Sequence, residues 1–380
     1  MEKLKNNLVM KAIAVFPQEK KISIIEHPEP KLLSGTEIKI KIQEVGICGT
    51  DREIARLEYG TPPKGSPYLV IGHETIGQVV EVGSQVSKIK TGDFVVPMVR
   101  RPCWHPECPA CRSGRQDFCL TGDFSERGIK LLHGFMTEFI VDEEKYMNFV
   151  PPEIKDLAVL VEPLTIAEKG LIQVWDIEKR LPWLDVPGAE EKYAHKQKAV
   201  VLGAGPVGLL GTMALLVRGF DTWVYSRDPK ESVKAKFVES IGGKYLSSRD
   251  IAIQKLPEQI GNIDLIYEAT GAATISFQAM EVLGINGVFI FTGVPGRKGP
   301  IQIDADLIMR NLVLKNQLVY GTVNAGKDAF EAAILDLGKF AKRWPAQIRQ
   351  VITGRYPITN YQDLLLGPIS GMKRVITFSN

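Results

Sequence analysis

The chain has 380 residues, of which 44% are hydrophobic and 24% are charged, and its formal net charge is +3 at pH 7. This composition is typical of a soluble globular protein, and the length suits two domains better than one core. So small a charge gives no reason to expect a surface for nucleic acid, and no run approaches the ~18 apolar residues that span a bilayer. The opening, MEKLKNNLVMKAIAV, has no signal-peptide pattern. We therefore expect a cytoplasmic protein that binds neither nucleic acid nor membrane.

Candidate metal ligands follow apolar segments in the first half of the chain. The alternating run EIKIKIQEV (residues 37–45) predicts a strand that leads to Cys48. The segment PYLVIG leads to His73 and Glu74, and DLAVLV leads to Glu162. Cysteine, histidine and carboxylate together form the ligand set of an open zinc site with room for substrate. Taken singly, each has an ordinary alternative: a small core residue, a hydrogen-bonded histidine or a turn residue.

Four of the five cysteines are clustered, with the spacing C-x4-C-x2-C-x7-C. Their segment is rich in proline, so it cannot form a long helix, and it has little apolar material of its own. Zinc prefers four soft ligands in a tetrahedron, and a site closed by four thiolates is structural rather than catalytic. A pair of disulfides and free thiols are the alternatives, and a reducing cytoplasm disfavours the disulfides. We predict a structural zinc bound by Cys103, Cys108, Cys111 and Cys119.

A glycine-rich turn in the second half of the chain has the dinucleotide fingerprint G-x-G-x-x-G. It follows the apolar strand KAVVL and precedes a helical apolar pattern, as the fingerprint requires. Gly203 permits the turn, Gly205 lets the backbone approach the pyrophosphate, and Gly208 lets the helix pack on the strand. The later segments IDLIYEATG (263–271) and GVFIFTGVPG (287–296) have the pattern of buried parallel strands that end in glycine turns. We predict that this half of the chain binds a nucleotide.

The end of the next strand, TWVYSRD, predicts which nicotinamide nucleotide is preferred. An NAD-specific site has a carboxylate there, which accepts hydrogen bonds from the ribose 2′-hydroxyl. This chain has Ser226 and Arg227 instead, which suit a 2′-phosphate. Asp228 becomes the NAD-selecting acid if the alignment shifts by one residue, but it precedes Pro229, so we expect it in the turn and pointing away. We predict a preference for NADP, with NAD accepted.

The motifs GICGTD, GHE, the four cysteines, VEPL and GAGPVG occur in this order, and together they resemble the zinc-containing medium-chain dehydrogenases across essentially the whole chain. Within that family the sequence is most similar to the glucose 1-dehydrogenase branch. Glu53 stands where alcohol and polyol dehydrogenases commonly have histidine, which favours the sugar branch. Val99 and Ile166 are apolar where some branch members have polar sugar contacts, so the preferred aldose stays open. The stretches that carry the similarity are CGTDRE (48–53), VRRP (99–102), GRQDFCLTGDFSERGI (114–129), HGFMTEFIVDEEKY (133–146) and GTVNAG (321–326).

The resemblance implies an α/β protein with a β-rich GroES-like catalytic domain and a doubly wound Rossmann domain. We expect the catalytic domain in residues 1–188, with the structural zinc lobe in 101–120. The NAD(P)-binding domain is expected in residues 189–324, and a return to the catalytic domain in 325–380. The charged, proline-interrupted stretch 175–198 is consistent with a crossover between the domains, and the active site is expected in the cleft between them.

The same resemblance implies an enzyme that oxidises the C1 hydroxyl of an aldose, chiefly D-glucose with D-galactose as the second candidate, to the aldonolactone with hydride transfer to NAD(P). Cys48, His73 and Glu162 then hold a catalytic zinc, with Glu74 as a direct or water-mediated partner. Zinc acts there as a Lewis acid on the sugar hydroxyl. Thr50, two residues past the zinc cysteine, has a hydroxyl suited to passing the proton outward.

Matching the branch position by position also implies contacts to substrate and nucleotide. The implied substrate contacts are Thr50, Glu126, Glu162 and Asn324. Surface solvation is the alternative for Glu126, and a simple turn is the alternative for Asn324. The implied nucleotide-binding residues are Gly203, Ala204, Gly205, Pro206, Val207, Gly208, Ser226, Arg227, Thr270, Gly271, Thr322, Val323 and Asn324.

Other functions stay open at this point. A polyol, secondary-alcohol or amino-alcohol dehydrogenase with the same zinc chemistry is the alternative within the family. A binding protein that has kept the fold without catalysis is the alternative outside enzymes, and the complete set of candidate zinc ligands disfavours it. The resemblance further implies a homotetramer, with a dimer as the alternative, whose partner is a small sugar.

Overall fold

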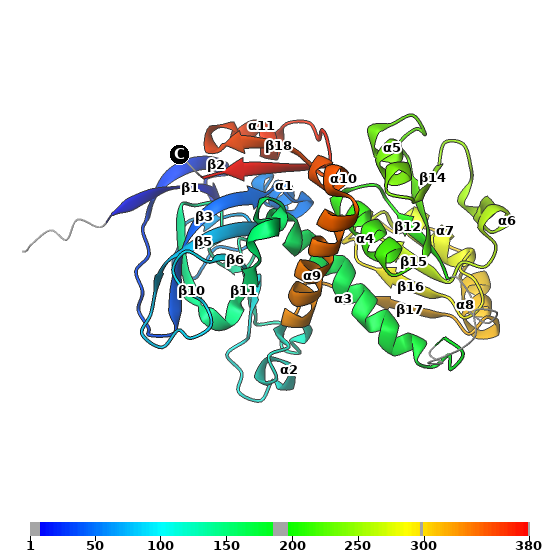
Figure 1. Ribbon diagram of the computed structural model, residues 1–380, viewed down its shortest axis with the longest axis horizontal. Helices are drawn as coiled ribbons and strands as arrows, with labels where there is room; N and C mark the ends of the chain where they lie inside the picture. The colour runs from blue at the N-terminus through cyan, green and yellow to red at the C-terminus, as the bar shows by residue number, and fades with distance from the viewer. Residues whose placement is uncertain (1–7, 185–196, 297–298, 379–380) are drawn as a thin grey trace, which may run out of the picture. The chain divides into compact units, whose positions relative to one another are not determined.

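A computed structural model describes residues 8–184, 197–296 and 299–378 (Figure 1). No helix of this described part is long and apolar enough to cross a membrane. Part of the predicted crossover, residues 185–196, lies outside the description, as do residues 1–7 of the segment read for a signal peptide. Two compact units make up the chain. One consists of Met1–Glu162, Asn324–Ala341 and Ile348–Asn380, and the other of Pro163–Val323 and Lys342–Gln347.

The first unit is rich in β-structure, as predicted. Its largest sheet has seven strands in the order β11-β6-β5-β3-β19-β18, with β10 also paired to β3, and two three-stranded sheets have the orders β2-β1-β4 and β7-β8-β9. The strands are β1 (Val9–Phe16), β2 (Lys21–Pro28), β3 (Glu37–Gly46), β4 (Leu69–Val70), β5 (Glu74–Val82), β6 (Phe94–Pro97), β7 (Arg100–Arg101), β8 (Ser125–Arg127), β9 (Leu131–Leu132), β10 (Phe139–Glu143), β11 (Met147–Val150), β18 (Ile352–Pro357) and β19 (Lys373–Thr377). The helices that lie wholly or partly in it are α1 (Gly49–Ala55), α2 (Pro109–Arg112), α9 (Lys327–Arg343), α10 (Pro345–Gln350), α11 (Tyr361–Leu366) and the first two residues of α3 (Val161–Glu178).

Strand β3 lies at the centre of the large sheet, and it is the strand that the alternating apolar and polar residues of EIKIKIQEV predict. Its isoleucines Ile38, Ile40 and Ile42 are fully buried, whereas the lysines between them are only partly buried. The strand pairs antiparallel with β5, with Gly46 opposite Glu74, and antiparallel with β19, with Gly46 opposite Val375. The end of β3 therefore lies between the start of β5 and the start of β19.

A buried ion cluster ties the small sheet β7-β8-β9 to the large one. Asp142 of β10 is 8% exposed and accepts hydrogen bonds from Arg101 of β7 and from Arg127 of β8, whose Nη2 lies 2.7 Å from Oδ2. Arg127 also donates to the carbonyl of Val141 at 2.8 Å. Because the cysteine segment begins just after β7, this cluster also anchors the chain that enters it.

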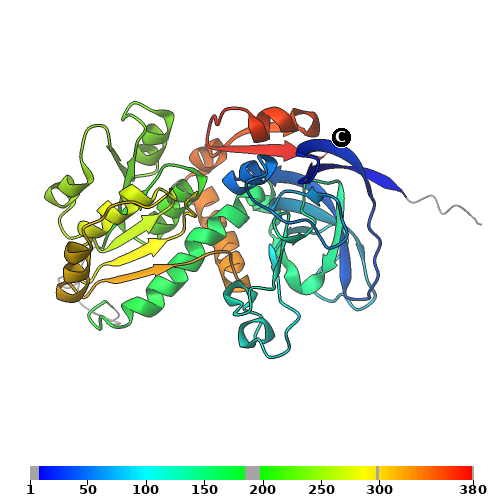
Figure 2. The ribbon, with the colours of Figure 1, turned by 180° about the vertical axis from the view of Figure 1, so that it is seen from behind.

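The second unit contains a six-stranded parallel sheet with the order β14-β13-β12-β15-β16-β17 (Figures 1 and 2). This is the order of a doubly wound dinucleotide-binding sheet, so the predicted Rossmann architecture is confirmed. Its strands are β12 (Lys198–Leu202), β13 (Asp221–Ser226), β14 (Lys244–Ser247), β15 (Leu265–Glu268), β16 (Val288–Phe291) and β17 (Leu318–Gly321). Its helices are α3 (Val161–Glu178), α4 (Pro206–Val217), α5 (Val233–Ser240), α6 (Leu256–Ile260), α7 (Ala273–Glu281) and α8 (Ala305–Leu314).

The central strands of this sheet are apolar because both of their faces are covered. All four residues of β15 are buried, and its neighbours on either side supply the fully buried Val200 and Phe289. The unit begins at Pro163, within α3, so this helix precedes the boundary at residue 189 that the sequence suggests. The boundaries given from the sequence for the catalytic domain, the NAD(P)-binding domain and the C-terminal return stay predictions.

The Asp142 cluster generates a stability prediction. Burial works against its charge, but Arg127 and Arg101 hold the pKa of Asp142 at about 2, below its usual value. Replacing Asp142 with Asn leaves two buried guanidinium groups without their counter-charge, so the free energy of unfolding should fall by roughly 3–5 kcal/mol. Denaturant titration at pH 7 measures this loss.

The pH dependence of that loss has a defined sign. A carboxyl whose folded pKa is depressed contributes stability above its unfolded pKa of about 4, and the contribution disappears as pH falls toward 2. The difference in free energy of unfolding between Asp142→Asn and the unmodified chain should therefore shrink as pH falls from about 4 toward 2. Asp176→Asn is the control, because Asp176 pairs with Lys179 at an exposed site and should change stability by no more than ~0.5 kcal/mol. Equal losses in the two variants would contradict the assignment.

Candidate active site and metal centres

The register of the large sheet brings the first group of predicted metal ligands together. Cys48 lies two residues beyond β3, and His73 and Glu74 lie at the start of β5. The cysteine sulfur, an imidazole nitrogen and a carboxylate oxygen of these residues all lie within 4.8 Å of one another. A Cβ atom on Gly46 would lie 2.3 Å from Oε2 of Glu74, so only glycine at this position lets the carboxylate cross β3. Soft and hard donors thus converge as a transition-metal site requires.

Asp51 orients two of these ligands and is fully buried. Its Oδ1 lies 3.1 Å from Nδ1 of His73, and its Oδ2 accepts a hydrogen bond of 2.9 Å from the backbone N–H of Cys48. Burial disfavours the charged imidazole, but the Asp51 carboxylate raises the pKa of His73 well above its usual value. A carboxylate on one nitrogen leaves the other for a metal, the usual arrangement around a zinc histidine.

Lys373 of β19 forms an ion pair with Glu74, and both side chains are almost wholly buried. Its Nζ lies 2.5 Å from Oε2 of Glu74 and also donates to the carbonyl of Ile47 at 3.2 Å. Burial alone would lower the pKa of Lys373, but the Glu74 carboxylate raises it above its usual value. The ammonium therefore balances part of the negative charge at the site.

Glu162 lies in the first turn of α3 and is 8% exposed. Burial raises the pKa of its carboxyl to about 7, with His73 opposing this rise and Glu74 adding to it. The Glu162 carboxyl thus interacts electrostatically with His73 and Glu74, although it is outside the group of donors that lie within 4.8 Å of one another. Thr50 is half-buried in the first turn of α1.

Two neighbours of the cluster were not among the residues predicted from the sequence. Asp51 occupies the third helical position after Cys48, where a side chain that caps the helix start is expected, so a local signal for it exists. Lys373 has no such signal, because 299 residues separate it from Glu74. Only the pairing of β19 with β3 brings it to the site.

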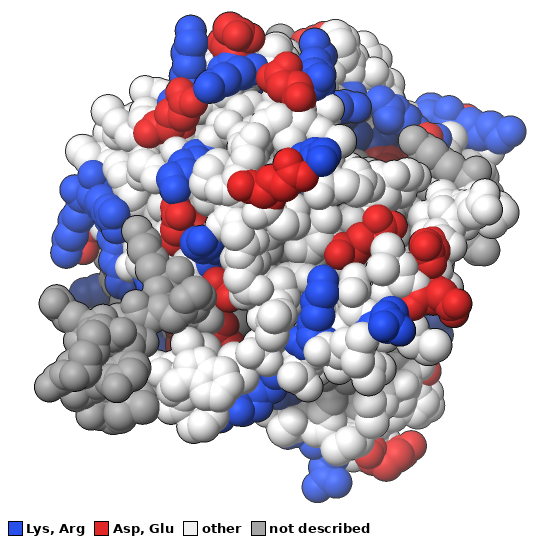
Figure 3. All heavy atoms as spheres, turned by 90° about the vertical axis from the view of Figure 1, so that its right-hand side faces the viewer, with Lys and Arg blue, Asp and Glu red and all other residues white. Residues whose placement is uncertain are grey.

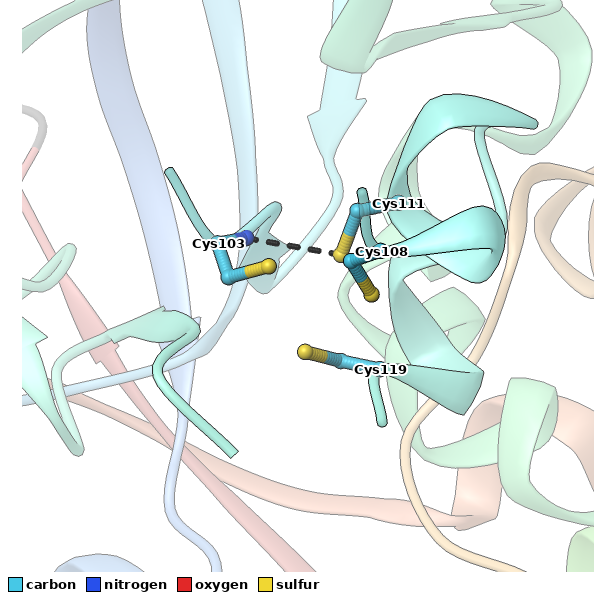
Figure 4. Close-up of side chains that lie close together, drawn as sticks. All are labelled: Cys103, Cys108, Cys111 and Cys119. Atoms are coloured by element: carbon cyan, nitrogen blue, oxygen red, sulfur yellow. Dashed lines mark hydrogen bonds between the residues drawn. The ribbon is translucent and has the colours of Figure 1, made fainter. Parts of the chain in front are cut away.

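The four-cysteine lobe has the geometry of a second metal site (Figure 4). Cys108 precedes α2, Cys111 lies within it, and Cys119 follows the short 3₁₀ helix η1 (Gln116–Phe118). Figure 4 shows the four thiols turned toward a common space, and their sulfurs lie within 4.8 Å of one another. All are free thiols, so the disulfide alternative does not hold. Four convergent thiols fit a closed structural zinc site.

The glycine-rich turn has the shape that a dinucleotide requires. Gly203 has a φ of +102°, and a Cβ atom on Gly208 would lie 2.1 Å from the carbonyl oxygen of Gly203. By contrast, a Cβ atom on Gly205, which precedes α4, would have no neighbour within 4 Å. The backbone at the positive end of α4 is thus open, and a diphosphate fits there.

The predicted selector of the cofactor lies at the end of β13. Arg227 is exposed, whereas the carboxylate of Asp228 lies 3.1 Å from Nζ of Lys234. Arg249, which the sequence did not indicate, donates to the carbonyl of Arg227 at 2.9 Å. It follows β14, whose Ser247 is in register with Ser226, and the ends of neighbouring parallel strands meet at one edge. Arg227 and Arg249 therefore both lie at this edge of the sheet.

The remaining predicted nucleotide residues follow two other strands of the same sheet. Thr270 and Gly271 come after β15, and Thr322 and Val323 come after β17. The Thr322 hydroxyl lies 3.1 Å from Nε2 of Gln173, and the Val323 carbonyl accepts a hydrogen bond from α3. All of these residues lie at the carboxyl edge of the parallel sheet, where doubly wound folds bind ligands.

The two predicted sugar contacts, Glu126 and Asn324, lie together although 198 residues separate them. Asn324 donates to Oε1 of Glu126 at 3.0 Å, and Arg100 donates to the same oxygen at 2.9 Å and 3.0 Å. Glu126 is 6% exposed, so the surface-solvation alternative does not hold for it. Asn324 has a φ of +59°, which agrees with a turn, and it is held to Glu126 as well.

Comparison with known proteins places the chain in a family. Residues 34–152 match the alcohol dehydrogenase GroES-like domain, and residues 155–378 match the glucose dehydrogenase C-terminus. The chain belongs to the glucose dehydrogenase branch of the zinc-dependent medium-chain dehydrogenases. The predicted GroES-like and Rossmann architecture is thereby confirmed.

Relatives of this family match the chain along its whole length. The glucose 1-dehydrogenase of Methanocella arvoryzae is 34% identical and covers 97% of this chain and 99% of its own. Glucose 1-dehydrogenase 2 of Vulcanisaeta moutnovskia is 36% identical and also covers 97% of this chain and 99% of its own. The structure of Haloferax mediterranei glucose dehydrogenase in complex with NADP, Zn and gluconolactone is 32% identical, with a TM-score of 0.86 and coverage of 98% of this chain and 100% of that one.

The two ligand clusters predict two zinc ions per chain, which elemental analysis of purified protein measures. Cys108→Ser should reduce the content to one and lower the melting temperature, because the lobe has little apolar core without its metal. Ser113→Ala, at an exposed position of the same lobe, is the control and should retain both ions. A content of one zinc in the unmodified chain, or of two in Cys108→Ser, would contradict the assignment.

Proposed function

We propose that the chain is a zinc-dependent glucose 1-dehydrogenase, which oxidises the C1 hydroxyl of D-glucose to the aldonolactone and transfers the hydride to NADP or NAD. The observation that carries the proposal is the convergence of Cys48, His73 and Glu74, with which Glu162 interacts electrostatically, in a chain that matches glucose 1-dehydrogenases along 97% of its length. By comparison, galactitol-1-phosphate dehydrogenase of Escherichia coli is 20% identical, a similarity that shows the fold alone.

Cys48, His73 and Glu162 are the residues that would hold the catalytic zinc, and Glu74 would bind it directly or through water. Zinc bound there supplies Lewis acidity toward a sugar hydroxyl. Asp51 keeps the imidazole of His73 in one orientation, and Lys373 offsets the charge of Glu74. The Thr50 hydroxyl, on the helix that begins next to Cys48, accepts the proton of the C1 hydroxyl at Oγ1 and at the same time donates its own proton toward solvent.

Glu126 and Asn324 orient the sugar. The hydrogen bonds from Arg100 and Asn324 all reach Oε1 of Glu126, and no described residue donates to its Oε2. Oε2 is therefore available to accept a hydrogen bond from a sugar hydroxyl. Because Arg100 and Asn324 hold the carboxylate in place, the sugar meets an acceptor that is already oriented, which lowers the entropic cost of binding.

A panel of substrates tests this function. D-glucose, D-galactose, a polyol, a secondary alcohol and an amino alcohol are assayed with NADP and with NAD, and D-glucose should give the highest kcat/KM. Cys48→Ser should lower kcat more than ~100-fold, the loss that even an outer partner of a metal can cause. Nucleotide binding and the far-ultraviolet spectrum should stay unchanged in this variant. Preference for a non-sugar alcohol would replace the proposal with the alternative, and near-normal turnover of Cys48→Ser would refute the zinc assignment.

Cofactor choice generates a separate prediction. We infer that Arg227, assisted by Ser226, binds the 2′-phosphate, because Asp228 is engaged by Lys234. Charge-assisted contacts of about 1.5–3 kcal/mol imply that Arg227→Ala raises KM for NADP roughly ten- to a hundredfold and leaves KM for NAD nearly unchanged. Arg349→Ala removes an exposed arginine elsewhere and is the control. If Arg227→Ala discriminates between the cofactors as the unmodified chain does, another residue is the selector.

We propose a homotetramer in the cytoplasm, with a dimer as the alternative. Strand β17 ends the parallel sheet, and β17 and α8 expose apolar side chains, among them Val313 at 70% and Leu314 at 64%. Figure 3, which faces the side where α6 and α8 lie, shows broad uncharged areas between mixed acidic and basic side chains. Such an edge suits contact with a second copy. Light scattering at micromolar concentration tests the assembly, and a monomer would refute it.

A further inference from the structure

The carboxylate of Glu268 joins two loops at the edge of the parallel sheet. Glu268 is the last residue of β15 and is fully buried. Its Oε1 accepts hydrogen bonds from the backbone N–H and the hydroxyl of Thr270, both at 2.6 Å, and from the N–H of Gly271 at 2.8 Å. Its Oε2 accepts a hydrogen bond of 3.0 Å from the N–H of Gly293, in the loop after β16. One side chain thus holds the loops that follow two neighbouring strands.

These loops are packed as closely as backbone allows. A Cβ atom on Gly293 would lie 2.1 Å from the backbone nitrogen of Gly271, and one on Gly271 would lie 2.8 Å from the carbonyl oxygen of Val294. Thr270 also reaches the glycine-rich turn, since a Cβ atom on Gly203 would lie 2.7 Å from its methyl group. A change at the carboxylate is therefore transmitted to both loops and to the turn.

The place of Glu268 in the sheet assigns it to one half of the cofactor. Doubly wound sheets consist of two mononucleotide-binding halves, and each half binds its ligand at the carboxyl ends of its strands. Here β12, β13 and β14 form the half that carries Ser226 and Arg227. Strands β15, β16 and β17 form the other half, which faces the nicotinamide mononucleotide portion.

We propose that Glu268 is a positioning residue for the nicotinamide half of the dinucleotide, and that it acts through the backbone of Gly271 and Gly293. The inference rests on the proposed function only in that the chain binds a nicotinamide dinucleotide. The carboxylate is suited to this task because it offers acceptors alone, and three N–H groups and one hydroxyl point at it. A neutral amide has one oxygen, so its NH₂ group would face at least one of these donors.

Glu268→Gln tests the proposal by calorimetry with two ligands. NADP contains both halves of the dinucleotide, whereas 2′,5′-ADP contains the adenosine half alone. Without these hydrogen bonds to Glu268, the two loops must be ordered when NADP binds, and if that cost equals one or two hydrogen bonds to a charged group, the dissociation constant rises about ten- to a hundredfold. The constant for 2′,5′-ADP should stay within about twofold, since the first half of the sheet is untouched. Glu258→Gln, at an exposed site on α6, is the control and should change neither constant.

Hydrogen exchange in the absence of ligand supplies a readout besides binding. In Glu268→Gln the amides of Thr270, Gly271 and Gly293 should exchange faster, while those of β12 and β13 keep their protection. Gly293→Ala disturbs the same junction from the opposite loop and should weaken NADP but not 2′,5′-ADP. If Glu268→Gln does not fold, Gly293→Ala tests the proposal in its place.

The outcomes separate this inference from the proposed function. Equal weakening of both ligands would mean that Glu268 only supports the fold, and no weakening of NADP would mean that it has no role in binding. Either result overturns the inference. Failure of the unmodified chain to bind either NADP or NAD would instead overturn the proposed function.

Discussion

The antiparallel register of β3 with β5 and β19 is the constraint on which the candidate active site depends. Gly46 lies opposite both Glu74 and Val375, so the end of β3 meets the starts of β5 and β19, which are far from it in the sequence. A side-chain period of two means that a slip of one residue would turn Glu74 away from Cys48. The alternating isoleucines of β3 prevent that slip, since it would expose them. Burial of an apolar strand face therefore sets the geometry of the polar site.

Buried carboxylates recur in both units, and each one connects segments that the chain order separates. Asp51 connects α1 to His73, Asp142 connects the small sheet to the large one, and Glu268 connects two loops of the parallel sheet. A buried charge is costly unless cations or N–H groups surround it, so each carboxylate fixes the positions of several partners at once. The polar groups thus provide orientation, while the apolar strands provide most of the stability.

Much of the fold followed from local patterns. The alternation of β3, the apolar strands of the parallel sheet and the turn at Gly203 are set by neighbours in the sequence, and the structure agrees with them. Spacing also sufficed for the cysteine lobe, because all four thiols lie within one short segment. Arg249 and Lys373 could not be found in this way. Each reaches its site through pairing between strands, and no local pattern encodes which strands pair.

The sequence by itself determined the family, the candidate ligands and the two types of sheet, because motif spacing and hydrophobic period are properties of contiguous residues. Only the tertiary structure decided which charges surround those ligands. It placed Lys373 on Glu74, engaged Asp228 with Lys234, and buried Glu126 between Arg100 and Asn324. Electrostatic interactions depend on distance and burial rather than on separation along the chain. They become defined only when packing brings the partners together.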